Sequence, residues 1–248
     1  MGKTTEIPWC HSTFNPWHGC SKVSPGCAHC YAEALSNRFG NDVWGPSAKR
    51  RFMSASYWGE PIKWNAQARA RKARKRIFCA SMSDVFKDRS DLSDERARLF
   101  RLIEATPNLD WLLLTKRPQN VAKLLPIEAL PGNVWLGVSA ENQKYWNERV
   151  PMLLSVRATV HFVSAEPLLA PIDILGHSGE HLPDWIIVGG ESGPSFRPMA
   201  VEWARSIRDQ SLDQDIVFFL KQLGGYPDKR HRLEQFPPDL RIQEFPET

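Results

Sequence analysis

The sequence predicts an α/β fold, a TIM-like or partial (βα) barrel of parallel strands. From residue 77 onward, short aliphatic runs alternate with helical or loop segments, which is the pattern of repeated βα units. The runs lack the polar alternation of a half-exposed strand, as expected for parallel strands buried on both faces. At 248 residues the chain suits one large domain. We therefore expect a single (βα)-barrel domain over 1–248, with an open doubly wound sheet as the competing architecture.

The expected strands and helices follow from these runs and from the spacing of apolar residues between them. A weak first strand is expected within residues 9–14, and six stronger ones at 77–80, 111–114, 134–138, 160–163, 185–188 and 216–220. Helices are expected at 31–39, 93–105, 117–125, 142–149 and 201–212. Residues 1–40 would hold a cysteine loop and the first helix. Residues 226–248, which contain four prolines, would form an irregular C-terminal tail.

Composition places the chain among ordinary globular proteins, with 42% hydrophobic and 24% charged residues. No apolar run approaches the roughly 20 residues needed to cross a bilayer. The first residues lack the apolar region of a secretory signal. The odd number of cysteines, several of them grouped, indicates a reducing compartment rather than a disulfide framework. We expect a cytoplasmic protein that does not interact with membranes.

The net charge of +4 depends on one basic segment, residues 69–76. The chain has 32 basic and 28 acidic residues; without this segment's six, 26 basic residues would remain and the net charge would be −2. The segment could contact the phosphates of a nucleic acid. A solvated helix face leading into the next strand explains it equally well. The six residues are Arg69, Arg71, Lys72, Arg74, Lys75 and Arg76.

Three of the five cysteines, Cys20, Cys27 and Cys30, lie within eleven residues. Three thiolates on a short loop form a soft donor set for a metal. Pro25 and Gly26 allow the backbone to turn sharply between them. Cys30 precedes the helix expected at 31–39, whose N-terminus favours a thiolate over a thiol. The loop therefore predicts a metal or cluster site.

Three cysteines are one ligand too few for a closed zinc site or for a fully protein-ligated iron–sulfur cube. One interpretation is a [4Fe–4S] cluster whose fourth iron stays open for a small ligand. A second is zinc, with His18, His29 or Cys10 as the additional ligand. Ordinary buried thiols are a third. Cys79 lies within an expected strand and is better explained as a core residue.

Polar residues follow the carboxyl end of each strong run, at 81–84, 115–117, 139–142, 164–167, 189–192 and 221–222. Each cluster alone could serve only a turn or a helix cap. In a barrel, however, this end is the rim where active sites are assembled. We expect the clusters and the three-cysteine loop to share that mouth. Lys116 and Arg117 are the most informative members, since cations at a buried strand end need an anionic partner.

Six motifs, in this order, resemble an uncharacterised phage and bacterial family, the phage three-cysteine-motif proteins. The resemblance covers the chain from about residue 9 to residue 225. The motifs are Cys20-x6-Cys27-x2-Cys30-Tyr31, Ser81-Met-Ser-Asp84, Leu114-Thr-Lys-Arg-Pro118, Trp135-Leu-Gly-Val-Ser-Ala-Glu-Asn-Gln143, Glu166-Pro-Leu-Leu169 and Val188-Gly-Gly-Glu-Ser-Gly193. That family is similar in turn to radical S-adenosylmethionine enzymes.

The wider resemblance implies a [4Fe–4S] cluster on Cys20, Cys27 and Cys30, with S-adenosylmethionine bound at the open iron. Reductive cleavage of the sulfonium would give a deoxyadenosyl radical, which would abstract hydrogen from a substrate. The chain departs from the enzyme pattern in the longer spacing between the first two cysteines. The Gly-Gly-Glu motif, which in those enzymes ends the second strand, follows a late strand here, and Asp84 stands in the second-strand position.

Under this hypothesis the candidate residues fall into three groups besides the cysteines. The catalytic candidates are Asp84, Lys116 and Glu166; the cofactor-binding candidates are Ser83, Ser139, Glu141, Gly189, Gly190 and Glu191; the candidates for anionic groups of the substrate are Arg117, Lys221 and Gln222. Trp9, Trp17 and Trp44 could stack on adenine or a base, or pack in the core.

Two alternative functions remain. The first is a non-enzymatic module, stabilised by zinc or a cluster, that binds nucleic acid or a partner protein. The second keeps the barrel but uses the metal as a Lewis acid for hydrolysis or group transfer. The substrate is expected to be a nucleotide or nucleic acid, and its identity does not follow from the sequence.

Overall fold

The structure is a computed structural model that describes residues 5–176 and 181–247. Its strands are β1 (Ser12–Thr13), β2 (Trp17–His18), β3 (Arg51–Phe52), β4 (Lys75–Cys79), β5 (Leu109–Thr115), β6 (Val134–Ser139), β7 (Val160–Ala165), β8 (Trp185–Gly189) and β9 (Val217–Gln222). Its α-helices are α1 (Tyr31–Arg38), α2 (Ala55–Trp58), α3 (Glu60–Arg71), α4 (Ser93–Glu104), α5 (Val121–Leu124), α6 (Gln143–Leu154) and α7 (Val201–Asp213).

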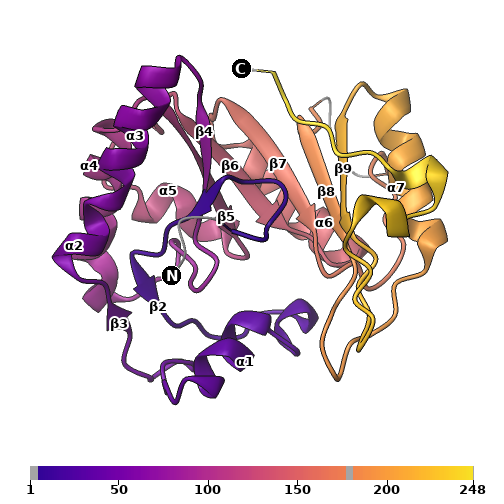
Figure 1. The fold of residues 1–248 in the computed structure, drawn as a ribbon, viewed down its shortest axis with the longest axis horizontal. Helices are drawn as coiled ribbons and strands as arrows, with labels where there is room; N and C mark the ends of the chain where they lie inside the picture. Colours follow the sequence, from indigo (N-terminus) through magenta and orange to yellow (C-terminus); the bar gives the residue numbers. More distant parts are fainter. Residues whose placement is uncertain (1–4, 177–180, 248) are drawn as a thin grey trace. The chain divides into compact units, whose positions relative to one another are not determined.

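In the described residues, seven strands form one sheet in the order β1-β4-β5-β6-β7-β8-β9, and β2 and β3 form a second (Figure 1). The strands β1, β4 and β5 pair in parallel, and so do β7, β8 and β9. β2 and β3 are antiparallel. The predicted parallel α/β sheet is therefore confirmed.

Most of the expected elements are present. The weak first strand and all six stronger runs are strands, and the helices expected at 93–105 and 201–212 are α4 and α7. The helix expected at 117–125 is present in part, as a 3-10 helix over Pro118–Asn120 followed by α5. Pro118 opens a 3-10 turn there, and α5 ends at Leu124 because Leu125 precedes Pro126 and is extended. The helices α2 and α3 and the pairing of β2 with β3 were not predicted.

The chain divides into two compact units. The first contains residues up to 22 together with 32–136 and 157–159, and the second contains 23–31, 137–156 and the residues from 160 on. β6 begins in the first unit and ends in the second. The single (βα)-barrel domain over 1–248 stays a prediction.

Aromatic side chains fill the core of the first unit, where α3 packs on β4 and β5. The Phe14 ring stacks on Tyr57 at 5.0 Å between centroids and meets Trp111 edge-on at 5.6 Å. Trp9 and Trp17 are only 2% and 0% exposed, so of the two predicted alternatives they pack in the core and do not stack on a base. They belong to the core because their large apolar area is removed from water there.

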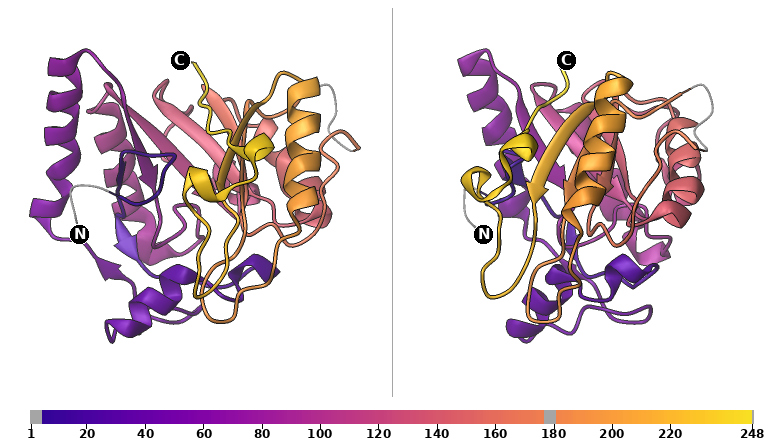
Figure 2. Two further views of the ribbon diagram at one scale, coloured as in Figure 1. Left: turned by 45° about the vertical axis from the view of Figure 1, so that its right-hand side comes forward. Right: turned by 90° about the vertical axis from the view of Figure 1, so that its right-hand side faces the viewer.

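The core of the second unit is built around Trp185 on β8. Its ring lies 5.9 Å from Phe162, 6.0 Å from Phe219 and 5.6 Å from Phe245, between centroids. The residues around Phe245 run antiparallel to β9, with Leu220 N–H donating to the Ile242 carbonyl. The tail, drawn in yellow in Figure 2, thus covers the open edge of β9.

Two short 3-10 helices, Leu233–Gln235 and Pro238–Leu240, lie within the tail. Asp239 in the second accepts hydrogen bonds from Arg205 and Arg208 of α7. These contacts hold the tail on α7 within the second unit. In the described part of the chain, no helix has the length and apolar character that crossing a membrane requires.

Candidate functional site

In the first unit, the residues after β4 and β5 form a buried network around Asp84. Thr115 Oγ1 donates to Asp84 Oδ1 at 2.8 Å, and Arg117 Nη1 donates to Oδ2 at 2.7 Å. The backbone N–H groups of Phe86 and Lys116 also donate to this carboxylate. Asp84 and Arg117 are only 5% and 4% exposed. The anionic partner that the sequence required for Arg117 is therefore Asp84, and the pair is buried and charge-assisted.

Arg117 also reaches the first cysteine of the loop. Its Nη1 lies 3.7 Å from Cys20 Sγ, and its Nη2 donates to the carbonyl and the hydroxyl of Ser21 at 2.7 and 3.2 Å. Burial and the charge of Asp84 raise the pKa of the Cys20 thiol, and Arg117 opposes them without reversing the shift. The guanidinium thus favours a thiolate at Cys20, together with the backbone of Ser21.

Ser83 lies between β4 and Asp84. Its Oγ is buried and has no hydrogen-bond partner among the described residues. A buried hydroxyl without a partner is costly unless another group satisfies it. Ser83 therefore keeps the capacity to bond a ligand, which its predicted cofactor role requires.

In the second unit, a buried carboxylate holds the segment that carries Cys27 and Cys30. Ser24 Oγ donates to Glu141 Oε1 at 2.6 Å, and Arg149 Nη1 lies 3.1 Å from Glu141 Oε2. Glu141 is 0% exposed. A Cβ atom on Gly26 would lie 2.4 Å from Glu141 Oε1, so only glycine allows this close approach. Arg149 also donates to the carbonyl of Ser139 at 2.7 Å.

A second carboxylate, Glu191, contacts the same segment. Arg197 binds it with Nη2 at 2.6 Å, with Nε at 2.9 Å and with its backbone N–H at 2.8 Å. His29 Nδ1 lies 3.1 Å from Glu191 Oε2, and Arg197 Nη2 also donates to the Pro25 carbonyl. Burial alone would raise the pKa of Glu191, but the hydrogen bonds from Arg197 and His29 lower it overall. Glu191 is therefore held as a carboxylate.

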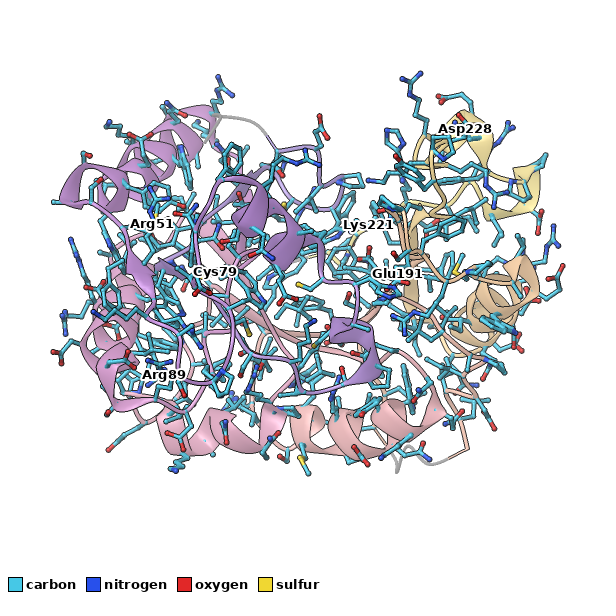
Figure 3. The ribbon with its side chains drawn as sticks, turned by 90° about the horizontal axis from the view of Figure 1, so that it is seen from below. Arg51, Cys79, Arg89, Glu191, Lys221 and Asp228 are labelled. Carbon is cyan, nitrogen blue, oxygen red and sulfur yellow. The ribbon has the colours of Figure 1, made fainter. Side chains whose placement is uncertain are left out.

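The third carboxylate of the second unit, Glu166, forms an ion pair with Lys221 of β9. A Cβ atom on Gly189 would lie 2.7 Å from Glu166 Cγ. Gly190 and Gln222 exchange two hydrogen bonds, Gly190 N–H to the Gln222 carbonyl and Gln222 Nε2 to the Gly190 carbonyl. Gly189 thus leaves room for the side chain of Glu166, and Gly190 lies close enough to β9 to pair with Gln222. Figure 3 labels Glu191 and Lys221.

Each predicted carboxylate therefore has a basic partner in its own unit. The pairs are Asp84–Arg117, Glu141–Arg149, Glu166–Lys221 and Glu191–Arg197. Arg149 and Arg197 were missed by sequence reasoning. The need to neutralise a buried carboxylate would have pointed to some cation, but not to which one. Catalytic, cofactor and substrate roles of the predicted residues stay predictions.

None of the five cysteines forms a disulfide, and all lie in described residues. Cys79 is 0% exposed, in agreement with its predicted place in the core, and burial raises the pKa of its thiol. Within the described residues, no group of three or more His, Cys, Asp or Glu side chains is arranged as a metal site. Cys20 belongs to the first unit and Cys27 and Cys30 to the second. Their convergence on one cluster stays a prediction.

The basic segment opens β4 at the end opposite Asp84. Arg74 Nε pairs with the buried carboxylate of Asp110 at 2.6 Å, and Lys75 Nζ lies 5.1 Å from the centre of the Trp64 ring. Arg69 and Arg71 belong to the last turn of α3 and are exposed. The segment is thus the exposed end of a helix leading into a strand. The charges of Arg74 and Lys75 are engaged by contacts within the protein.

A family description matches residues 4–239 of the chain: Protein of unknown function (DUF5131). The chain belongs to this family. Its predicted resemblance to an uncharacterised group is confirmed at that level, and the phage origin and the three-cysteine name stay predictions. No curated protein matches the sequence.

Among solved structures, the chain is similar to a cysteine-to-serine variant of spore photoproduct lyase. The identity is 16%, the TM-score is 0.52, and the match covers 85% of this chain and 63% of that chain. A cysteine-to-alanine variant with dinucleoside spore photoproduct matches at 16% identity and a TM-score of 0.47, over 92% of this chain and 62% of that one. The first likeness shows the fold and confirms the predicted TIM-like partial barrel. The chain spans less than two thirds of the length of these proteins.

Proposed function

We propose that this protein is a radical S-adenosylmethionine-like enzyme with a [4Fe–4S] cluster on Cys20, Cys27 and Cys30. The observation that carries the proposal is the three-cysteine loop of a parallel α/β fold similar to that of spore photoproduct lyase, a radical S-adenosylmethionine enzyme. Cys20 lies only seven residues before Cys27 in the sequence. Three thiolates fit a cluster whose fourth iron binds another ligand.

The donor set fits this group for two reasons. Thiolates are the ligands that iron–sulfur clusters require, and Arg117 provides a positive charge at the Cys20 sulfur. When bound, the cluster and S-adenosylmethionine supply one-electron cleavage of a sulfonium and hydrogen abstraction by the resulting carbon radical. The chain's own residues orient and shield the reactants, since the cofactors carry the difficult chemistry.

The described residues support distinct tasks in this scheme. Ser83 Oγ, buried without a partner, would bond a polar group of the cofactor. Glu166 and Lys221 would exchange their ion pair for contacts with a polar substrate. The Asp84–Arg117 pair is saturated by protein groups, so we assign it to the support of Cys20 instead of to proton transfer.

For the substrate, we propose a nucleotide or nucleic acid in a reducing, cytoplasmic compartment. Support comes from the exposed basic residues at the end of α3 and from the likeness of the fold to that of a spore photoproduct lyase. Arg69, Arg71 and Lys72 would contact phosphates away from the chemistry. Arg74 already forms an ion pair with Asp110, so part of its charge is neutralised within the protein.

Anaerobic reconstitution tests the proposal. The wild-type protein is expected to bind iron and sulfide in equal amounts, and Cys20→Ala, Cys27→Ala and Cys30→Ala are each expected to lose them. Cys79→Ala is the matched control, because Cys79 is a buried strand residue. Equal iron and sulfide in all four variants, or none in the wild type, would overturn the proposal.

One observation favours a second candidate, a zinc-stabilised binding module. His29 Nδ1 lies against Glu191, and a carboxylate at one ring nitrogen commonly orients a histidine whose other nitrogen binds a metal. His29 would then complete a site with the three cysteines. Stoichiometric zinc that is lost in His29→Ala, with no sulfide, would establish this function.

A further inference from the structure

We propose that Arg117 is a positioning residue for Cys20 and that its guanidinium raises the reduction potential of the cluster. The inference rests on the proposed function and assigns Arg117 a task other than the predicted contact with substrate. The chain offers a direct observation for it, since Arg117 touches the sulfur of a predicted cluster ligand.

The position of Arg117 is fixed by many contacts. Thr115 Oγ1 accepts a hydrogen bond from its backbone N–H at 2.9 Å, and Pro118 begins a 3-10 turn directly after it. The guanidinium is held by Asp84 on one side and by Ser21 on the other. Because a guanidinium is planar and its donors diverge at fixed angles, these contacts determine where its N–H groups point.

The contact with Cys20 is therefore set by the protein before any metal binds. Arg117 Nη1 donates both to Asp84 Oδ2 at 2.7 Å and toward Cys20 Sγ at 3.7 Å. Arg117 is only 4% exposed, so water screens its interaction with Cys20 little. A lysine at this position would keep the charge but has no rigid fork to serve Asp84, Ser21 and Cys20 together.

Other cations of the first unit act in the same direction. Arg50 and Lys87 both interact electrostatically with Cys20. Arg50 donates to the carbonyls of Val43, Ala48 and Gly45. Arg117 is the cation in contact with the sulfur, and its charge acts against that of the neighbouring Asp84 carboxylate.

The effect on the potential follows from charge. Reduction adds an electron to a cluster whose thiolates are already negative, and hydrogen bonds to the sulfurs together with nearby positive charge stabilise that state. Removing the Arg117 donor should make the cluster harder to reduce. The effect is a change in an equilibrium, so it is measurable without knowledge of the substrate.

The test is a redox titration of the reconstituted protein followed by electron paramagnetic resonance. We expect Arg117→Lys to lower the ratio of reduced to oxidised cluster at a given potential about tenfold, a shift of ~59 mV for one electron. Arg74→Lys is the matched control, because Arg74 also pairs with a buried aspartate of the first unit but lies at the opposite end of β4.

A second variant tests the inference in case Arg117→Lys does not fold. Asp84→Asn combined with Arg117→Met removes both charges together, so that no unpaired carboxylate is buried. Loss of the Asp84 carboxylate alone should favour reduction, so the reference for this variant is Asp84→Asn, and we expect the double variant to have a lower potential than that single variant. Unchanged potentials in both variants, with cluster present, would overturn the inference and leave the proposed function intact. A wild-type protein without iron and sulfide would overturn the proposed function itself.

Discussion

The two units hold their cysteines by different means. In the first unit, the cation Arg117 contacts the sulfur of Cys20 itself. In the second, the carboxylates of Glu141 and Glu191 contact Ser24 and His29, the neighbours of Cys27. A cation at a sulfur changes the energy of the thiolate, whereas hydrogen bonds to neighbouring residues fix the path of the backbone.

The difference explains why the second unit pairs each of these carboxylates with an arginine. An uncompensated carboxylate beside Cys27 and Cys30 would disfavour their thiolates. Arg149 and Arg197 cancel that charge and leave the carboxylate oxygens available as acceptors. We therefore expect changes in the second unit to affect stability and cluster retention, and changes at Arg117 to affect the potential.

The largest expected effect is that of Glu141→Gln. It leaves Arg149 buried without its charge partner, which should lower the free energy of unfolding by about 3 to 5 kcal/mol. Urea unfolding followed by circular dichroism measures this loss. Glu202→Gln is the control, because Glu202 is 76% exposed. A loss no larger than that of the control would show that Glu141 does not anchor the segment.

A smaller loss is expected for Gly26→Ala. The added methyl group would approach the fixed carboxylate of Glu141, and such overpacking typically costs about 1 to 3 kcal/mol. The segment would shift, and iron content after reconstitution should fall. Gly132→Ala is the control, since nothing lies within 4 Å of the added atom there. Full iron retention in Gly26→Ala would contradict the prediction that Glu141 fixes the backbone of this segment.

Lowering the pH should remove the contribution of Glu191 to the free energy of unfolding. Because its pKa in the folded protein is lowered from 4.5, its stabilisation is complete above that value and is lost as the pH falls through the lower folded pKa. The difference in unfolding free energy between wild type and Glu191→Gln should therefore be constant near neutral pH and shrink below about 4.5. A difference that grows on acidification would contradict the assignment.

The smallest effect is expected in the tail. Asp239→Asn weakens exposed ion pairs with Arg205 and Arg208, which contribute little because water screens them. The unfolding midpoint should fall slightly, and the cluster potential should stay unchanged. A changed potential would mean that the tail affects the cysteines. That result would contradict the distinction between contacts that change the potential and contacts that only fix the backbone.

The sequence was most informative where a local pattern decides the structure. Fully buried runs such as 185–188 become strands because their apolar residues have no polar interruption. The helix expected at 117–125 is only partly α-helical because Pro118 and Pro126 confine the α-helical part to a single turn. Helix α3 could have been found from Pro61, a residue typical of the first helical turn.

The partners of the charged residues could not be predicted in the same way. The sequence indicated that Arg117 needs an anion, but Asp84 lies 33 residues earlier. Arg197 and Pro25 are separated by 172 residues. Such pairs depend on the register of distant strands, which local patterns do not encode. The sequence therefore identified Glu141 and Glu191 as candidates but missed Arg149 and Arg197, the arginines that pair with them.

The most direct test of the account is the iron and sulfide content of the anaerobically reconstituted protein, measured beside its cysteine variants. We predict iron and sulfide in equal amounts, lost in Cys20→Ala, Cys27→Ala and Cys30→Ala and retained in Cys79→Ala. Stoichiometric zinc without sulfide in the wild-type protein would contradict the account.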